Sequence, residues 1–555
     1  MDYYNLGAYR RPVSTANRDA QAWFDRGLIW TYGYNHEKAV ACFETALAHD
    51  PTCAMAHWGI AYAAGPNYNF EWWKMDPTTK ADALARAYDS TKAALALVGA
   101  VTPVERALIE ALPARYPQRD PIDDQRPWND DFAAAMKTAH AAHPDDLDLT
   151  AIYAESILNQ TPWRMWDIRH NTVADGADSL AAQAVLERAL ETPTGRDHPG
   201  ILHLYVHLME MSPTPEKALG AGDRLRELVP DAGHLIHMPT HIDIQCGHYH
   251  DALFWNLKGI EADLKFANRN GRINFYTSYR IHAYHFAVYS AMFLGQYAPA
   301  MTAAEDMMSE IPERLLRKTS PPMADMLEGY FSIKTHVQIR FGRWHDIVSA
   351  PLREDQALYC HTTASQHYAK AVAHAALGDV PAAESARQDF LKARAHVPDS
   401  RRIHNNRCVD LLDIAAEMLD GELEYRKGNH DVAFTHLQKA IALEDGLNYD
   451  EPWGWMQPVR HALGALALEQ DRLDLAEQAY REDLGLAGEL PRACIHPDNV
   501  WSLTGLDACL RQRGAGDTAE ATLIRQQREL AAARTDQPVG ASCFCAQSAT
   551  KAEHP

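Results

Sequence analysis

The chain has 555 residues, 46% of them hydrophobic and 23% charged, which is the composition of an ordinary folded protein. Its formal net charge of −21 excludes a surface suited to nucleic acid or to an anionic membrane. No apolar run is long enough to span a bilayer, and the start of the chain lacks the apolar core of an export signal, so we expect a cytoplasmic protein whose nine cysteines are mostly reduced.

The first predicted elements are two helices between residues 23 and 51. Small residues allow antiparallel helices to approach, large ones fill the groove beside them, and a proline ends the second helix. The spacing matches the tetratricopeptide repeat (TPR) at seven positions: Trp23, Gly27, Trp30, Ala39, Phe43, Ala46 and Pro51.

Weaker copies of this pattern begin near Met55, Tyr284, His367, Gly421 and Gly464. Alternating β-branched runs, which would indicate strands, are nearly absent. The sequence therefore predicts an all-α, TPR-like solenoid of stacked antiparallel helical hairpins with a concave face.

We expect four parts along the chain. Two irregular stretches in the first, at 65–80 and 113–130, combine Pro, Asp and aromatic residues and are expected to cap or line a pocket. The parts are N-terminal hairpins (1–130), a histidine-rich centre (131–320), C-terminal repeats (321–535) and a cysteine-containing tail (536–555).

The central part holds histidines at helical spacing. Residues three or four apart share one face of a helix, with Cβ atoms roughly 5–6 Å apart, so two imidazoles can bind one cation. Three such stripes occur in one segment: His203 and His207 with Glu210; His234, His237 and His241; and His282 and His285.

A single histidine pair on a helix is usually only a polar surface feature. Three neighbouring pairs favour a metal site, because clustered imidazoles repel one another once protonated. The nitrogen-rich set disfavours calcium and magnesium and suits copper, iron or zinc. Three imidazoles suit a zinc hydrolase, six suit a dioxygen-binding copper pair, and a glutamate with several histidines suits iron; the spacing leaves these alternatives open.

Two further features bear on this site. Pro239, within the second stripe, either kinks a helix or begins a new one. Cys543 and Cys545 form a Cys-x-Cys pair that either supplies soft ligands to the site or stays idle at the terminus.

Several segments together resemble a family of large bacterial and fungal TPR-domain proteins, across essentially the whole chain. They include FDRGLIWTYGYNHEKA, HPGILHLYVHLMEMS, AGHLIHMPTHIDI and ASCFC, and the histidine segment is the most specific of them. The resemblance implies the all-helical repeat fold and little about the reaction. Thr240 and Asp243 depart from the family pattern, which bears only on substrate identity.

The leading hypothesis is a metal-dependent enzyme with a mononuclear or dinuclear histidine centre, oxidising a small organic substrate with dioxygen. Glu210 would be a ligand or an acid–base group, and Tyr205 or Tyr279 a proton donor. The alternatives are a zinc-dependent hydrolase, a scaffold that binds a protein partner along the TPR groove, and a metal storage or sensing protein. The oligomeric state stays open.

Overall fold

The structure is a computed structural model that describes residues 3–488 and 490–546. The chain forms two compact units, Met1–Ile242 with Lys258–Arg280 and Asp243–Leu257 with Ile281–Pro555. None of the described helices combines the length and hydrophobicity needed to cross a bilayer. The predicted four-part division follows motif content and stays a prediction.

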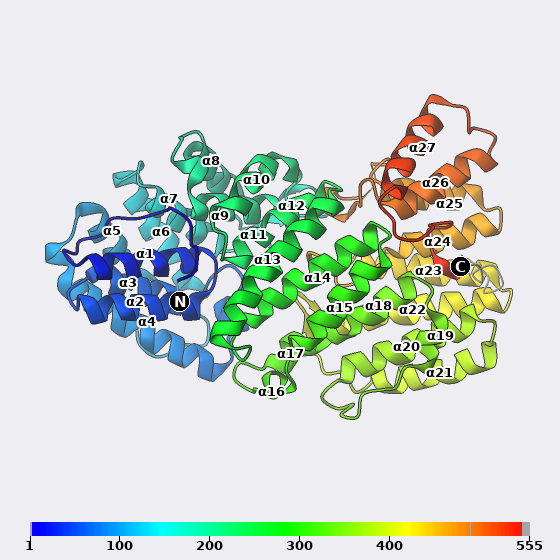
Figure 1. Ribbon diagram of the computed structural model, residues 1–555, viewed down its shortest axis with the longest axis horizontal. Helices are drawn as coiled ribbons and strands as arrows, with labels where there is room; N and C mark the ends of the chain where they lie inside the picture. The colour runs from blue at the N-terminus through cyan, green and yellow to red at the C-terminus, as the bar shows by residue number, and fades with distance from the viewer. Residues whose placement is uncertain (1–2, 489, 547–555) are drawn as a thin grey trace. The chain divides into compact units, whose positions relative to one another are not determined.

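Helices dominate the first unit (Figure 1). Eleven α-helices lie wholly within it: α1 Arg18–Tyr32, α2 His36–His49, α3 Ala54–Ala64, α4 Pro77–Leu97, α5 Pro103–Arg115, α6 Arg126–Ala142, α7 Leu147–Leu158, α8 Ser179–Leu190, α9 Pro199–Met209, α10 Leu219–Leu228 and α11 Gly233–His237. Three helices have residues in both units: α12 Pro239–Gln245, α13 Tyr249–Asn270 and α14 Thr277–Phe293.

The second unit is built in the same way. Its remaining α-helices are α15 Tyr297–Ser309, α16 Glu313–Leu316, α17 Met323–Leu327, α18 Ile333–Arg340, α19 Trp344–Ser349, α20 Cys360–Ala376, α21 Val380–Arg394, α22 Cys408–Arg426, α23 His430–Glu444, α24 Val459–Glu469, α25 Leu473–Asp483, α26 Val500–Gln512 and α27 Ala519–Ala532.

Strands are confined, in the described part of the chain, to two short antiparallel pairs. β1 (Trp166–Asp167) pairs with β2 (Thr172–Val173), and β3 (Arg402–Ile403) pairs with β4 (Asn406–Arg407). Each pair is two residues long and stands alone, so neither forms a layer of the fold.

Within each unit the helices stack as antiparallel hairpins. In the first unit α1 packs on α2 and also on α3, and α3 packs on α4 and also on α5. In the second unit α20 packs on α21 and α22, and α24 packs on α25 and α26. Contact with the next helix and the next but one is the pattern of helical repeats, so the predicted all-α hairpin architecture is confirmed.

The glycines of the predicted repeats explain how closely these helices pack. A Cβ at Gly27 of α1, or at Gly59 of α3, would lie 2.6 Å from the ring of Phe43, which therefore fits between the two helices only because both positions are glycine. The second unit repeats the arrangement: a Cβ at Gly464 would lie 2.5 Å from the ring of Tyr480. In both hairpins the glycine precedes the large residue by sixteen positions.

The two predicted irregular stretches pack on each other. Arg115 donates to the carbonyl of Pro66 at 2.5 Å, and a Cβ at Gly65 would lie 1.9 Å from the hydroxyl of Tyr116. The second stretch is shorter than predicted, because α5 continues through Pro113 to Arg115 and α6 begins at Arg126.

Candidate metal centre

The helix that carries the first histidine stripe is held at its start by a histidine. His198 Nδ1 accepts the backbone N–H of Ile201 at 3.2 Å, and Pro199 occupies the first helical position, where a missing N–H has no cost. One residue on, a Cβ at Gly200 would lie 2.6 Å from the ring of Tyr32, so α9 packs tightly against α1. This close approach brings His203 to the end of α1.

The second stripe begins on α11, which is anchored by a buried tyrosine. The Tyr276 hydroxyl donates to Asp263 at 2.9 Å and accepts the backbone N–H of His234 at 3.4 Å. A Cβ at Gly233 would lie 2.2 Å from Asp263 Oδ1, so only glycine fits at the start of this helix.

Pro239 begins a new helix, which is the second of its two predicted roles. α11 ends at His237, and Pro239 is the first residue of α12. The Thr240 hydroxyl donates to the carbonyl of His237 at 2.7 Å across this junction. Met238, the one residue between the two helices, has helical φ and ψ of −52° and −41°, so the stripe continues from His237 to His241.

Three histidines meet in the interior of the first unit. One ligand nitrogen from each of His203, His207 and His234 lies within 4.8 Å of the others, and all three side chains are at most 2% exposed. The ring centroids of His203 lie 4.7 Å from His207 and 4.9 Å from His234. A tetrahedral ion bound at 2.0–2.1 Å needs nitrogens about 3.4 Å apart, so binding requires the rings to turn inward.

Two histidines of this triad, His203 and His234, have ring nitrogens that the described residues do not bond. Within the described residues, no hydrogen bond reaches His203 Nε2 or either ring nitrogen of His234. Buried polar atoms are nearly always paired, so such nitrogens indicate a ligand. The backbone of Tyr32 bonds the His203 ring, leaving Nε2 as the lone pair that points into the cluster.

Electrostatics keep these imidazoles neutral. Burial lowers the pKa of His203 far below its ordinary value, and neighbouring His207 lowers it further. Burial and neighbouring His203 have the same effect on the pKa of His234. Neutral imidazole is the form that binds metal ions, so both side chains are ready ligands at neutral pH.

Glu210 links the triad to the second stripe. Its carboxylate lies 3.2 Å from His207 Nδ1 and 2.7 Å from His241 Nδ1. Burial raises the pKa of Glu210, but His241 and His207 outweigh it and lower the pKa to about 2. The ionised carboxylate fixes both rings with their Nε2 atoms turned away from it, the usual arrangement behind a metal-binding histidine.

His241 is in turn paired with His237. Their Nε2 atoms lie 3.1 Å apart, and both rings are 1% exposed. Because His241 Nδ1 faces the Glu210 carboxylate, the proton of the neutral His241 ring lies on Nδ1 and Nε2 carries a lone pair. This lone pair accepts either a hydrogen bond from His237 Nε2 or a cation bound between the two rings. The first unit thus brings five of the seven predicted histidines into one connected cluster.

Aromatic side chains enclose the triad. Tyr34 lies 4.7 Å from His203 and 5.4 Å from His234 between ring centroids. Tyr68 lies 4.7 Å from His207, Trp163 lies 6.1 Å from it, and Tyr279 lies 4.9 Å from His234. Tyr68 comes from the stretch 65–80, whose pocket-lining role stays a prediction.

Tyr34 is a site residue that the histidine spacing did not identify. It sits in the turn between α1 and α2 with a φ of 53°, a left-handed conformation uncommon for a residue other than glycine. The order of residues does not reveal this conformation, so the histidine pattern offered no signal for Tyr34. Burial, followed by nearby Glu155, raises the pKa of Tyr34, so its phenol stays protonated.

The other predicted residues lie elsewhere. The Tyr205 hydroxyl donates to Glu187 of α8 at 2.9 Å, whereas Tyr279 touches the triad. His282 and His285 belong to the second unit, where His282 stacks on His404 with ring centroids 5.1 Å apart and His285 Nε2 lies 2.9 Å from Met456 Sδ. Their role as ligands stays a prediction.

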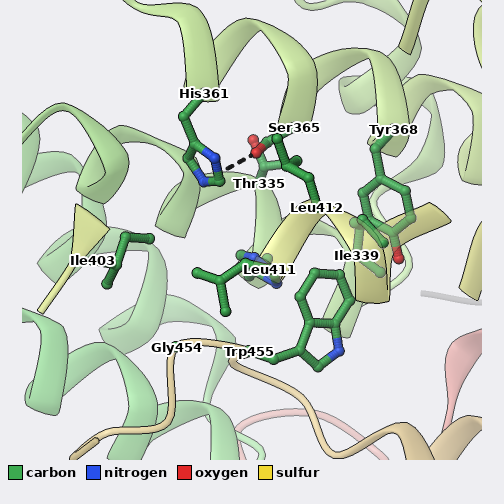
Figure 2. A pocket seen from close by; sticks show the side chains of 12 residues that line it. Thr335, Ile339, His361, Ser365, Tyr368, Ile403, Leu411, Leu412, Gly454 and Trp455 are labelled. Atoms are coloured by element: carbon green, nitrogen blue, oxygen red, sulfur yellow. Dashed lines mark hydrogen bonds between the residues drawn. The ribbon is translucent and has the colours of Figure 1, made fainter. Parts of the chain in front are cut away.

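The second unit has a small cavity with its own buried histidines. Figure 2 shows His361, Ser365, Tyr368 and Trp455 around it, with Ser365 3.4 Å from His361 Nε2. His336 also lines it, 4.9 Å from the ring of Trp455. Burial lowers the pKa of His336 to about 4 and, with His336 nearby, that of His361 to about 3, so both rings are neutral.

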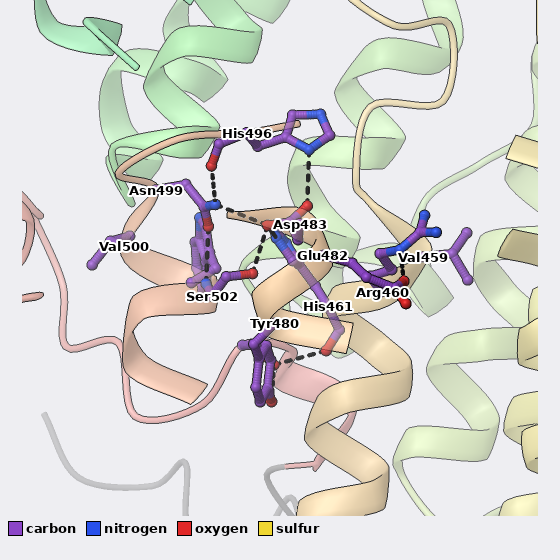
Figure 3. Close-up of polar contacts among 12 residues, drawn as sticks. Val459, Arg460, His461, Tyr480, Glu482, Asp483, His496, Asn499, Val500 and Ser502 are labelled. Carbon is purple, nitrogen blue, oxygen red and sulfur yellow. Dashed lines mark hydrogen bonds and ion pairs between the residues drawn. The ribbon is translucent and has the colours of Figure 1, made fainter. Parts of the chain in front are cut away.

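A second polar cluster in this unit is centred on Asp483 (Figure 3). Its carboxylate accepts hydrogen bonds from His461 and His496, each at 2.8 Å, and from the side chains of Asn499 at 2.9 Å and Ser502 at 2.6 Å. The other nitrogen of His461 is 2.8 Å from Arg340. Both nitrogens of His461 are therefore occupied by the protein itself.

No protein-family model matches this sequence, and no functionally described relative matches it. Among solved structures, the human IFIT1 dimer with m7Gppp-AAAA is 12% identical with a TM-score of 0.31, over 94% of this chain and 91% of that one. The APC/C hetero-tetramer Cut9–Hcn1 is 13% identical with a TM-score of 0.30, over 94% and 96%.

The P58(IPK) TPR domain is 14% identical with a TM-score of 0.19, over 82% of this chain and 99% of that one. TM-scores this low do not establish a shared fold. The assignment of the fold is therefore based on the packing of the helices described above.

Proposed function

We propose that the protein is a metal-dependent enzyme and that His203, His207 and His234 bind a transition-metal ion. Copper, iron and zinc are the ions that imidazole ligands suit. The single observation that carries the proposal is the buried triad, whose ligand nitrogens lie within 4.8 Å of one another while His203 Nε2 and both nitrogens of His234 have no hydrogen-bond partner among the described residues.

The surroundings of the triad support a catalytic rather than a purely structural ion. Three protein ligands leave at least one coordination position open, which is typical of catalytic centres. Tyr34, Tyr68 and Tyr279 place aromatic rings beside the three imidazoles, and such apolar surroundings suit a small organic substrate. With His237 and His241 beside the triad, the site holds more imidazoles than the three that a zinc hydrolase uses, so we favour a redox metal and oxidative, dioxygen-dependent chemistry.

Zinc-dependent hydrolysis is the second candidate. It uses the same three-imidazole set with a bound water in the open position. The oriented pair His207–Glu210, at 3.2 Å, favours a firmly held ion and serves either metal equally. Metal identity therefore separates the two reactions.

Elemental analysis of protein purified without a polyhistidine tag tests the proposal. We expect about one transition-metal ion per chain, or about two if His237 and His241 hold a second. In a His203→Ala/His234→Ala double variant the content should fall to less than about a tenth of that value, because two of three ligands are gone. Circular dichroism and thermal unfolding confirm that the variant folds.

His198→Asn is the matched control. His198 caps the start of the same helix and is fully buried, but its nitrogens already bond Ile201 and Asp148, and asparagine retains the capping acceptor. This variant should keep its metal. A folded wild-type protein that carries no metal and binds peptides would contradict the proposal and support the scaffold hypothesis.

A further inference from the structure

The tail of the second unit is held in place by a serine. The Ser542 hydroxyl donates to the carbonyl of His461 at 2.7 Å and lies 2.7 Å from the hydroxyl of Tyr480, while Arg340 donates to the Ser542 carbonyl at 3.3 Å. His461 is itself fixed by Asp483, as Figure 3 shows. Residue 542 is 1% exposed, so the chain is anchored just before the cysteine pair.

Contacts on the far side of the first cysteine complete this anchoring. The ring of Phe544 lies 6.2 Å from that of Trp501, and a Cβ at Gly342 would lie 2.9 Å from Phe544. Arg426 donates to the carbonyl of Cys545. The Cys-x-Cys segment is therefore packed into the second unit. Of the two predicted states, an idle terminus does not describe this segment.

The two sulfurs are joined and line a cavity. Cys543 and Cys545 form a disulfide in the structure, with Cys543 half-buried and Cys545 5% exposed. Both line a cavity whose wall also includes Tyr368, Met418 and Glu422. Sites for small molecules are usually apolar cavities with a few polar groups. In this cavity the two cysteines form part of the wall.

The other cysteines of the chain have a different environment. Seven lie outside the Cys543–Cys545 disulfide, and five of these are buried: Cys42, Cys53, Cys360, Cys408 and Cys509. Burial raises the pKa of Cys53 to about 11 and that of Cys509 to about 12, so these thiols stay protonated and unreactive. The half-buried Cys543 beside a covalent partner differs from all of these five.

We propose that Cys543 and Cys545 form a thiol–disulfide exchange site that faces this cavity and reacts with small disulfides and small thiols. This site is independent of the histidine centre, and neither proposal depends on the other.

The exchange is balanced without another cofactor. In the oxidised protein a small thiolate attacks Cys543 Sγ, the bond to Cys545 breaks, and Cys545 Sγ takes the electron pair and a proton. A second thiolate attacks the small-molecule sulfur of the mixed disulfide, which releases Cys543 as a thiolate and a small disulfide. The reverse sequence oxidises the protein and releases two small thiols per disulfide consumed.

The test uses the full-length protein reduced with dithiothreitol, desalted, and mixed with bis(2-hydroxyethyl) disulfide as the probe. Wild type should release two 2-mercaptoethanol molecules per chain and end with a Cys543–Cys545 disulfide, read by alkylation and peptide mass spectrometry. Cys545→Ser should release one and keep a mixed disulfide on Cys543. Cys543→Ser should react at least about tenfold more slowly, because only the buried sulfur is left.

Cys494→Ser is the matched control, since Cys494 is a half-buried cysteine of the same unit that lies outside the Cys543–Cys545 pair. It should behave as wild type. The proposal is overturned if reduced wild type releases no thiol, if Cys545→Ser releases as much thiol as wild type, or if both sulfurs are protected by a metal ion that the Cys543→Ser/Cys545→Ser variant loses.

Discussion

Two buried histidine clusters, one in each unit, differ in how the protein bonds their ring nitrogens. In the second unit, His461 has one nitrogen 2.8 Å from Arg340 and the other 2.8 Å from Asp483, whose carboxylate also receives His496. In the first unit, His203 Nε2 and both nitrogens of His234 have no hydrogen-bond partner among the described residues.

This difference separates structural histidines from candidate ligands. A buried imidazole whose two nitrogens are bonded by the protein stabilises the fold and has no electron pair to offer. One whose nitrogen faces other imidazoles is costly unless something binds it. Sequence spacing alone does not distinguish the two situations, because partners far along the chain determine them.

Removing Asp483, the shared acceptor of the hydrogen-bonded cluster in the second unit, should have the largest effect on stability. Asp483→Ala leaves two histidines, Asn499 and Ser502 without their shared acceptor in a buried site. We expect unfolding free energy to fall by about 3–5 kcal/mol, measured by guanidinium denaturation, with metal content unchanged.

Asp399→Ala is the control for that variant. The side chain of Asp399 is 82% exposed and 3.5 Å from Arg407, so its loss should change stability by less than about 0.5 kcal/mol. A loss of metal in Asp483→Ala would contradict the separation between the two clusters.

Removing the negative charge of Glu210, which contacts His207 and His241, should affect metal affinity instead of stability. Glu210→Gln keeps the shape of the side chain but cannot accept hydrogen bonds from His207 and His241 with both oxygens. Affinity for the metal should fall about 10–100-fold, measured by competition with a chelator of known affinity. Unchanged affinity would show that Glu210 does not orient His207.

The hairpins themselves should respond alike in both units. Gly27→Ala and Gly464→Ala each force a methyl group to within 2.6 Å or less of an aromatic ring, so each should lower the unfolding free energy by about 1–3 kcal/mol. Gly220→Ala is the control, since nothing lies within 4 Å of its Cβ and α10 should gain about 0.5–1 kcal/mol. Tolerance of both core substitutions would refute the proposed glycine–aromatic packing.

Acid should weaken the second unit by a smaller amount per group. Burial lowers the pKa of His336 to about 4 in the folded protein, below the value of about 6.5 that it has when unfolded. Below pH 6.5 the unfolded chain therefore binds more protons, and stability falls as the pH falls. From pH 7.5 to 5.5 we expect a loss of about 1 kcal/mol from this histidine.

His336→Gln should remove that share of the pH dependence, as seen in denaturation curves at the two pH values. Equal slopes for wild type and variant would contradict the assignment of a neutral, buried His336.

The fold was predictable because the packing of each helical hairpin depends on residues at a fixed, short spacing in the sequence. A glycine sixteen residues before Phe43 or Tyr480 is visible in the sequence and becomes the helix contact. Likewise, the four-residue spacing of His203 and His207 places both on one face of α9. These features need no knowledge of distant residues.

The rest of the site depends on tertiary contacts. Tyr34 reaches the triad because α9 packs on α1 and because its turn is left-handed, and neither fact is visible in the order of residues. Tyr205, predicted near the metal, lies two positions from His203 and therefore on another side of the helix, against Glu187. The predicted metal and reaction stay predictions.

X-ray absorption at the K-edge of the bound metal tests the central claim most directly. The account predicts a stoichiometric ion with three imidazole nitrogens at about 2.0–2.1 Å in wild type and one fewer in His234→Ala. A wild-type spectrum without imidazole scattering, or an unchanged nitrogen count in the variant, would contradict it.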